Sequence, residues 1–158
     1  MTFNRRFLTA AMALLLSNIA GQLGQAQSQG ANALQGAWSS ELKSQNAPPG
    51  VDGYRSFITF SAGGTTVESN GAPGFGPGTG AWEFVRGGEF AALWIKPIYD
   101  FQTGALQGTV KIRARIQMKS ADEYESLDTS DFFLPNGTLA VSWTALQTAK
   151  RIKVEPVN

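Results

Sequence analysis

The sequence predicts an all-β protein whose strands form an eight-stranded antiparallel up-and-down barrel. Apolar and polar side chains alternate over ten residues from Thr109 to Met118, which is typical of a strand with one buried face. Glycine-containing turns at 86–89 and 102–104 separate this strand from the ones before it. No segment after the first 26 residues carries the 3.6-residue period of an amphipathic helix of three turns. Long strands in an open sheet would leave exposed edges, and a closed barrel removes them.

Eight strands are expected in chain order, joined mostly by short turns. The fourth to sixth strands fill residues 78–118. A long proline-containing turn at 46–53 follows the first strand, and Ala62-Gly63-Gly64 joins the second strand to the third. The remaining strands are expected at 36–42, 54–60, 65–69, 121–134 and 138–154. A closed barrel of eight strands has an interior that holds side chains or one small ligand.

The N-terminal segment is expected to direct export. Arg5 and Arg6 precede an apolar run from Phe7 to Ala20, and Gly24-Gln25-Ala26 offers small residues for signal peptidase. We therefore predict a signal peptide over 1–26, a linker or one helical turn over 27–35, and a barrel domain over 36–154. The mature chain is predicted to start near Gln27 in the periplasm or outside the cell, with no membrane span.

Composition excludes several kinds of chemistry. The 158-residue chain has no cysteine and no histidine, so it lacks disulfides, Ser-His-Asp triads and the usual zinc ligands. Removing the two arginines of the predicted signal leaves 11 basic and 12 acidic residues, a net charge of about −1 that favours no nucleic-acid partner. We expect no metal and no cofactor. Any proton transfer must come from Asp, Glu, Tyr, Lys or Arg.

The segment Asn70–Thr79 has two interpretations. It contains four glycines, two prolines and a single aromatic residue, Phe75. It is either a plain connection or a mobile flap over the mouth of the barrel with Phe75 as its plug.

Four aromatic residues, Trp82, Phe90, Trp94 and Trp143, are candidates for the barrel interior. They are either ordinary core residues or the walls of an apolar ligand pocket. Trp143 is expected to face inward together with Leu139, Val141 and Ala145.

Glu68 and Arg113 are the candidate charged site residues. The alternation places Arg113 with Lys111 and Arg115 on an outward, solvated stripe. If Arg113 faced inward it would pair with Glu68, because a lone charge in a barrel interior is too costly. Such a pair could bind a ligand carboxylate or polarise a carbonyl. The acidic residues from Asp122 to Asp131 lack the spacing of a calcium loop and are expected to form a solvated face.

A resemblance to the lipocalins rests on Gly36-Ala37-Trp38 near the start of the barrel and on Arg151 near its end. In that family the tryptophan closes the barrel floor and a late arginine packs across its ring. The chain also resembles a group of small exported bacterial lipocalin-like barrels, through the segments 64–69, 78–83, 90–92 and 108–113. This resemblance implies a calycin-type barrel and says almost nothing about activity.

These observations favour an exported barrel that binds a small, largely apolar molecule. The alternative is a cofactor-free cyclase or isomerase, similar to the barrels of allene oxide cyclase and the polyketide cyclases, where orientation of a flexible substrate supplies most of the catalysis. A third possibility is a structural or interaction module with a filled core.

Overall fold

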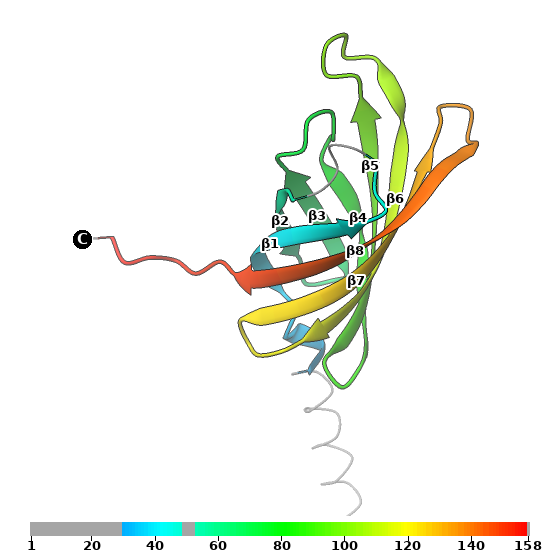
Figure 1. The fold of residues 1–158 in the computed structure, drawn as a ribbon. Helices are drawn as coiled ribbons and strands as arrows, with labels where there is room; N and C mark the ends of the chain where they lie inside the picture. The colour runs from blue at the N-terminus through cyan, green and yellow to red at the C-terminus, as the bar shows by residue number, and fades with distance from the viewer. Residues whose placement is uncertain (1–29, 49–52, 158) are drawn as a thin grey trace, which may run out of the picture.

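The computed structural model describes residues 30–48 and 53–157 and is an all-β closed barrel of eight strands (Figure 1). Each strand pairs with the next in antiparallel fashion, and β1 pairs with β8 to close the barrel. The predicted fold class is confirmed. The strands are β1 (Gly36–Gln45), β2 (Arg55–Phe60), β3 (Thr65–Asn70), β4 (Gly78–Arg86), β5 (Glu89–Tyr99), β6 (Leu106–Met118), β7 (Glu123–Phe133) and β8 (Leu139–Arg151).

The expected inward phase of β6 and most of β8 is confirmed. Val110, Ile112, Ala114 and Ile116 are buried, and their neighbours along β6 are more exposed. Trp143 and Ala145 face inward on β8, whereas Leu139 is exposed where a register shift interrupts the pairing with β7.

The expectation that the acidic residues of β7 form a solvated face is wrong at one position. Asp128 is 3% exposed, whereas its neighbour Leu127 is 52% exposed. The strand alternates as expected, but its inward positions are occupied by Tyr124, Ser126, Asp128 and Ser130. The pleat, rather than side-chain polarity, decides which residues enter the barrel.

One end of the barrel, here named the closed end, is sealed by residues 30–35 and by Arg151. Residues 30–34 form a helical turn at the lower end of the barrel in Figure 1, and the Leu34 side chain is fully buried in the core. The Trp38 indole donates to the Leu34 carbonyl at 2.9 Å, and the Arg151 guanidinium lies 4.2 Å from the Trp38 ring centre. The packing expected between Trp38 and Arg151 is therefore present. Arg151 also donates to the backbone carbonyls of Ala33, Gln35 and Ala121.

Aromatic rings fill the interior next to the closed end. Phe60 makes edge-to-face contacts with Trp82, Trp94 and Tyr124 at centroid distances of 5.9 to 6.3 Å. Phe90 packs on Trp82 at 5.8 Å. Edge-to-face pairs add attraction beyond the burial of their area, so this cluster forms the stable core of the barrel.

The opposite end, here named the loop end, carries the segment between β3 and β4. In this segment Phe75 forms an isolated bridge with Ile98 of β5. The Gly76 N–H donates to the Pro97 carbonyl, and the Tyr99 N–H donates to the Gly74 carbonyl. A Cβ at Gly74 would lie 2.4 Å from the Tyr99 carbonyl oxygen, so glycine is needed for this close approach. The loop is thus held against β5.

The predicted signal segment, 1–26, lies outside the described residues, so export stays a prediction. Within residues 30–48 and 53–157, no helix is long and apolar enough to cross a membrane.

Candidate functional site

The barrel interior contains a cluster of polar and ionisable side chains, which is unusual for a core. Charged residues are almost never fully buried unless they are paired. Here the buried polar residues come from six different strands and lie between the aromatic cluster and the loop end. They are Ser40, Ser56, Thr66, Glu68, Lys96, Ser126, Asp128, Ser130 and Gln147.

Glu68 and Lys96 form a buried ion pair at the loop end. The Lys96 Nζ lies 2.9 Å from the Glu68 Oε2, and the Ser56 hydroxyl donates to the Glu68 Oε1 at 2.6 Å. The Lys96 side chain is 0% exposed and that of Glu68 is 5% exposed. Gly78 faces the same space on β4, and a Cβ there would lie 2.8 Å from the Lys96 Cγ. The missing side chain at Gly78 therefore leaves room for the aliphatic part of Lys96.

The Lys96 ammonium is not satisfied by this pair. An ammonium carries three N–H donors, and beyond the Glu68 Oε2 at 2.9 Å the Nζ has no hydrogen-bond acceptor among the described residues. Its other contact is the Phe75 ring, whose centre lies 5.5 Å from Nζ. A buried donor without an acceptor costs free energy, so this nitrogen marks a position where a further oxygen would be favourable.

Asp128 lies in a second part of the cluster, reached from β7. The Ser126 hydroxyl donates to the Asp128 Oδ1 at 2.7 Å. Gln147 connects this part to β1, because its Nε2 donates to the Ser40 hydroxyl at 3.1 Å. The Ser40 hydroxyl in turn contacts the Ser56 carbonyl oxygen at 3.4 Å. Polar contacts therefore extend from Asp128 around the barrel wall to the strand that supports Glu68.

Burial dominates the electrostatics of the cluster. It raises the pKa of Asp128 to about 7; the Ser126 hydrogen bond opposes this shift and the charge of Glu68 adds to it. Burial lowers the pKa of Lys96, with Glu68 opposing the shift. The pKa of Tyr54 is raised by burial and by the negative charges of Glu68 and Asp128. Asp128 is thus a carboxyl group that titrates near neutral pH inside the barrel.

Little empty space remains in the cluster. A cavity of about 10 Å³ lies among its side chains, enough for about one water molecule. Tyr54 and Phe75 close the cluster towards the loop end, with ring centres 6.1 Å apart. The cavity is lined by Leu42, Tyr54, Ile58, Glu68, Trp94, Ile112, Asp128, Ser130 and Gln147.

The residues predicted as a site lie in different parts of the barrel. Glu68 belongs to the polar cluster, Trp94 lines its cavity and Phe75 lies over Lys96, whereas Trp82 and Phe90 belong to the aromatic core. The Trp94 indole donates to the Thr66 hydroxyl at 3.2 Å, and that of Trp82 donates to the carbonyls of Ser61 and Thr65. Trp143 is buried at 6% exposure.

The hypothesis of an inward pair between Glu68 and Arg113 is wrong. Arg113 faces outward on β6, its side chain is 47% exposed, and it pairs with Asp131 of β7. It lines an outer groove of about 380 Å³ together with Ala81 and Leu93. Successive side chains of a strand point to opposite faces, and Ile112 and Ala114 face inward. Arg113 between them therefore faces outward.

Lys96 and Asp128 are the site residues that sequence reasoning missed. A signal existed for Lys96, because it follows Trp94 by two positions and a strand places both on the same face. The signal for Asp128 was weaker, since an inward Tyr124 implies inward positions at 126 and 128. The exposed Leu127 between them suggested the opposite phase.

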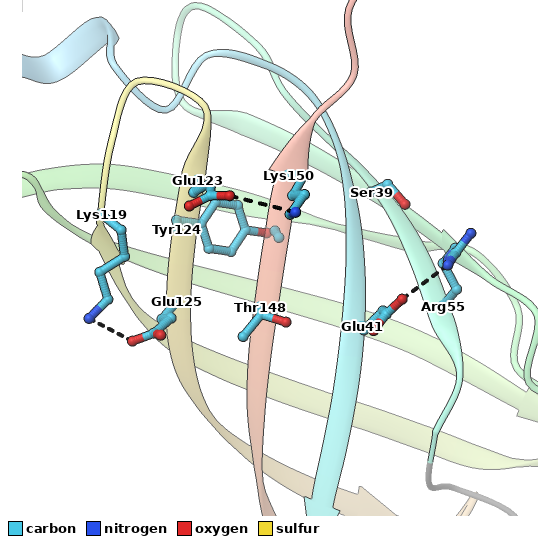
Figure 2. Close-up of a pocket in the computed structure, with 10 residues that line it drawn as sticks. Ser39, Glu41, Arg55, Lys119, Glu123, Tyr124, Glu125, Thr148 and Lys150 are labelled. Carbon is cyan, nitrogen blue, oxygen red and sulfur yellow. Dashed lines mark hydrogen bonds and ion pairs between the residues drawn. The ribbon is translucent and has the colours of Figure 1, made fainter.

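A larger hollow of about 530 Å³ lies on the outer surface of β1, β7 and β8 (Figure 2). Its charged side chains already pair with one another: Glu41 with Arg55, Glu125 with Lys119 and Glu123 with Lys150. Exposed pairs of this kind contribute little and are screened by salt. This outer surface therefore presents no unsatisfied group comparable to Lys96.

No protein-family model matches the chain, and no curated protein is found to be similar to it. Among residues 30–48 and 53–157, no group of three or more His, Cys, Asp or Glu side chains is placed to hold a metal ion. The geometry of the interior cluster is therefore the main indication of function.

Proposed function

We propose that this barrel binds a small, largely apolar molecule at the loop end of its interior, with an oxygen atom of that molecule accepting a hydrogen bond from Lys96. The observation that supports the proposal is the Lys96 Nζ, which is fully buried and has three donors but, beyond Glu68, no hydrogen-bond acceptor in the described residues. A carbonyl or carboxylate oxygen would satisfy it. The walls near Lys96 are apolar, because Val110 pairs with Lys96 across the strands and Phe132 follows on β7.

Stability alone does not account for the polar cluster. Replacing a buried ion pair with apolar residues of similar volume is often neutral or stabilising. The aromatic core at the closed end already supplies a well-packed interior. Retaining Glu68, Lys96 and Asp128 inside the barrel is therefore better explained by a binding role, since perturbed ionisable groups concentrate at functional sites.

Entry of the molecule requires side chains to move. A cavity of about 10 Å³ is far smaller than any organic ligand. Phe75 and Tyr54 cover the cluster, and both are only partly buried. Rotation of these two rings would open the space above Lys96 while the strands stay paired.

We also propose that the protein is an exported member of the lipocalin-like barrels. The eight-stranded closed barrel and the packing of Arg151 across Trp38 support this assignment. Export through a cleaved signal would leave residues from about 27 onward. The intact mass of the exported protein tests this, and a full-length mass in the soluble fraction would contradict it.

Native mass spectrometry of protein purified from its own exported compartment tests the binding proposal. We expect a co-purifying small molecule, released on denaturation. The matched control is the double variant Glu68→Gln with Lys96→Met, which removes both charges together and should keep the fold while losing the molecule. Equal amounts of the same molecule in wild type and double variant would contradict the role of Lys96. A ligand-free barrel that also fails to bind a panel of apolar carbonyl compounds would favour the structural module.

Asp128 favours a second candidate function, a cofactor-free cyclase or isomerase. A general acid or base works best when its pKa lies near the operating pH, and the pKa of Asp128 is raised to about 7. Binding and isomerisation differ in a simple readout. A binding protein returns the molecule unchanged, whereas an isomerase returns a product of equal mass and different chromatographic retention, and Asp128→Asn should abolish that conversion.

A further inference from the structure

We propose that Lys96 captures an aldehyde or ketone covalently, as an imine. This proposal rests on the proposed entry of a small molecule beneath Phe75, and goes beyond reversible binding to name the carbonyl group as the reacting part of that molecule. It assigns the amine of Lys96, rather than the carboxylates, as the reactive group of the interior.

The surroundings of the Lys96 amine are those of a nucleophile. Its side chain is fully buried, its Nζ has no hydrogen-bond acceptor beyond Glu68 in the described residues, and its stem lies against Gly78. A lysine becomes nucleophilic when desolvation favours the neutral amine. Burial lowers the pKa of Lys96 accordingly.

Glu68 is placed to accept the proton that must leave before attack. The ammonium of Lys96 transfers one proton over the 2.9 Å to the Glu68 Oε2, leaving a neutral amine. The nitrogen lone pair then forms a bond to the carbonyl carbon, the carbonyl oxygen takes the proton held by Glu68, and Glu68 takes one proton from the nitrogen, which gives a neutral carbinolamine. The hydroxyl group then leaves as water with the proton from Glu68, and the second nitrogen proton passes to Glu68, which leaves the C=N bond. No oxidant or reductant takes part in this condensation.

The other lysines with known ion pairs have different surroundings. The side chains of Lys119, Lys150 and Lys153 are 49%, 82% and 66% exposed, and each pairs with a surface carboxylate. Water hydrates these exposed amines, whereas burial removes water from the amine of Lys96. We therefore expect selective reaction at Lys96, and the exposed lysines of the same protein serve as the reference amines.

Reductive trapping tests the proposal. The folded protein is incubated with hexanal at about pH 7, sodium cyanoborohydride is added, and peptide mapping locates the hexyl groups. We expect Lys96 to be modified faster than Lys119 or Lys150, and to carry most of the hexyl groups, because burial favours its neutral, nucleophilic amine. Phe75→Ala should accelerate modification of Lys96 by uncovering it, and in concentrated urea the preference should disappear.

The control variants separate this reaction from general labelling. Lys150→Met should leave the labelling of Lys96 unchanged, whereas Glu68→Gln with Lys96→Met should remove the selective hexyl group while near-ultraviolet circular dichroism stays native. Failure to label Lys96 in both the wild type and Phe75→Ala, with the exposed lysines labelled, would overturn the proposal. If native mass spectrometry without reductant still shows bound hexanal in that case, the binding proposal stands and only the imine is lost.

Discussion

Buried polar atoms are hydrogen-bonded at the closed end of this barrel and only partly hydrogen-bonded at the loop end. At the closed end, the Trp38 and Trp82 indoles donate to backbone carbonyls, and Arg151 donates to three more while packing on the Trp38 ring. At the loop end, the Lys96 Nζ has no hydrogen-bond acceptor beyond Glu68 in the described chain, and the pKa of Asp128 is raised to about 7. Both ends are buried, so exposure does not explain the difference.

The difference separates stability from function within one interior. Satisfied aromatic packing stabilises the barrel, whereas buried and incompletely satisfied ionisable groups cost free energy. Natural proteins break the rules of packing mainly where function requires it. The comparison predicts that the closed end carries the larger share of the stability and the loop end the chemistry.

Trp38→Ala should produce the largest loss of stability. The substitution leaves a cavity, and it removes the indole donor to Leu34 and the ring under Arg151. We expect a loss of about 5 kcal/mol in the free energy of unfolding, measured with urea. Phe57→Ala, at an exposed position on β2, is the control and should change stability by about 0.5 kcal/mol or less. A loss below about 2 kcal/mol at Trp38 would contradict the stabilising role of the closed end.

Lys96→Met should cost slightly less, roughly 3–5 kcal/mol, because the buried Glu68 carboxylate loses its counter-charge. The double variant Glu68→Gln with Lys96→Met tests whether the loss comes from the unpaired carboxylate. With both charges removed, most of the lost stability should return, and the variant should equal or exceed the wild type. Urea unfolding of the four proteins in this cycle measures the coupling. A double variant as unstable as the single one would mean that the pair supports the fold itself.

The architecture of the barrel was predictable from the sequence because turns and alternation are local signals. Alternation on β6 and glycine turns on either side of β5 place the strands within a few residues of their true ends. Strand β8 ends at Arg151 rather than at Val154, and β7 begins at Glu123 rather than at Ala121. Short-range patterns determine such elements, so tertiary contacts changed only their ends.

The site was predictable only in part, because the apolar periodicity that identifies the strands gives the wrong face for its charged residues. Apolar periodicity assigns charged side chains to the outside, and Lys96 and Asp128 are charged residues at inward positions. Glu68 was identified, but its partner was sought on β6, where Arg113 faces outward. The separation of two residues in the sequence does not predict which inward side chains become neighbours in the barrel. Lys96 and Glu68 become neighbours only when β3 and β5 flank the inward Gly78 of β4.

Asp128→Asn should change the pH dependence of stability. The pKa of Asp128 is raised from 3.8 to about 7 in the folded protein, chiefly by burial, so between these values the folded state binds more protons than the unfolded state. The contribution of Asp128 is therefore fully present below about pH 4 and is lost as the pH rises towards 7. Relative to Asp128→Asn, the wild type should lose up to about 1 kcal/mol per pH unit over this window.

Taking the difference between two proteins removes the opposing effect of other carboxylates. A hydrogen bond from Arg115 lowers the pKa of Glu89, and one from Ser142 lowers that of Asp131; both groups stabilise the fold as the pH rises. They are present in the wild type and in Asp128→Asn alike. Urea unfolding at several pH values provides the curves, with Glu83→Gln on the exposed face of β4 as the control. Parallel curves for the wild type and Asp128→Asn would show that Asp128 ionises normally.

Arg113→Met should have the smallest effect, and it tests where the barrel wall separates inside from outside. Arg113 pairs with Asp131 on the outer surface, where water screens the attraction and two long side chains must be ordered to keep it. We expect a change of about 0.5 kcal/mol or less, and no coupling between Arg113→Met and Glu68→Gln in a double-mutant cycle. Lys96→Met is the matched comparison, because it also replaces a cation with methionine, but at an inward position where the expected loss of stability is several kcal/mol. A loss of several kcal/mol at Arg113, or coupling to Glu68, would place its guanidinium inside the barrel and reverse the phase of β6.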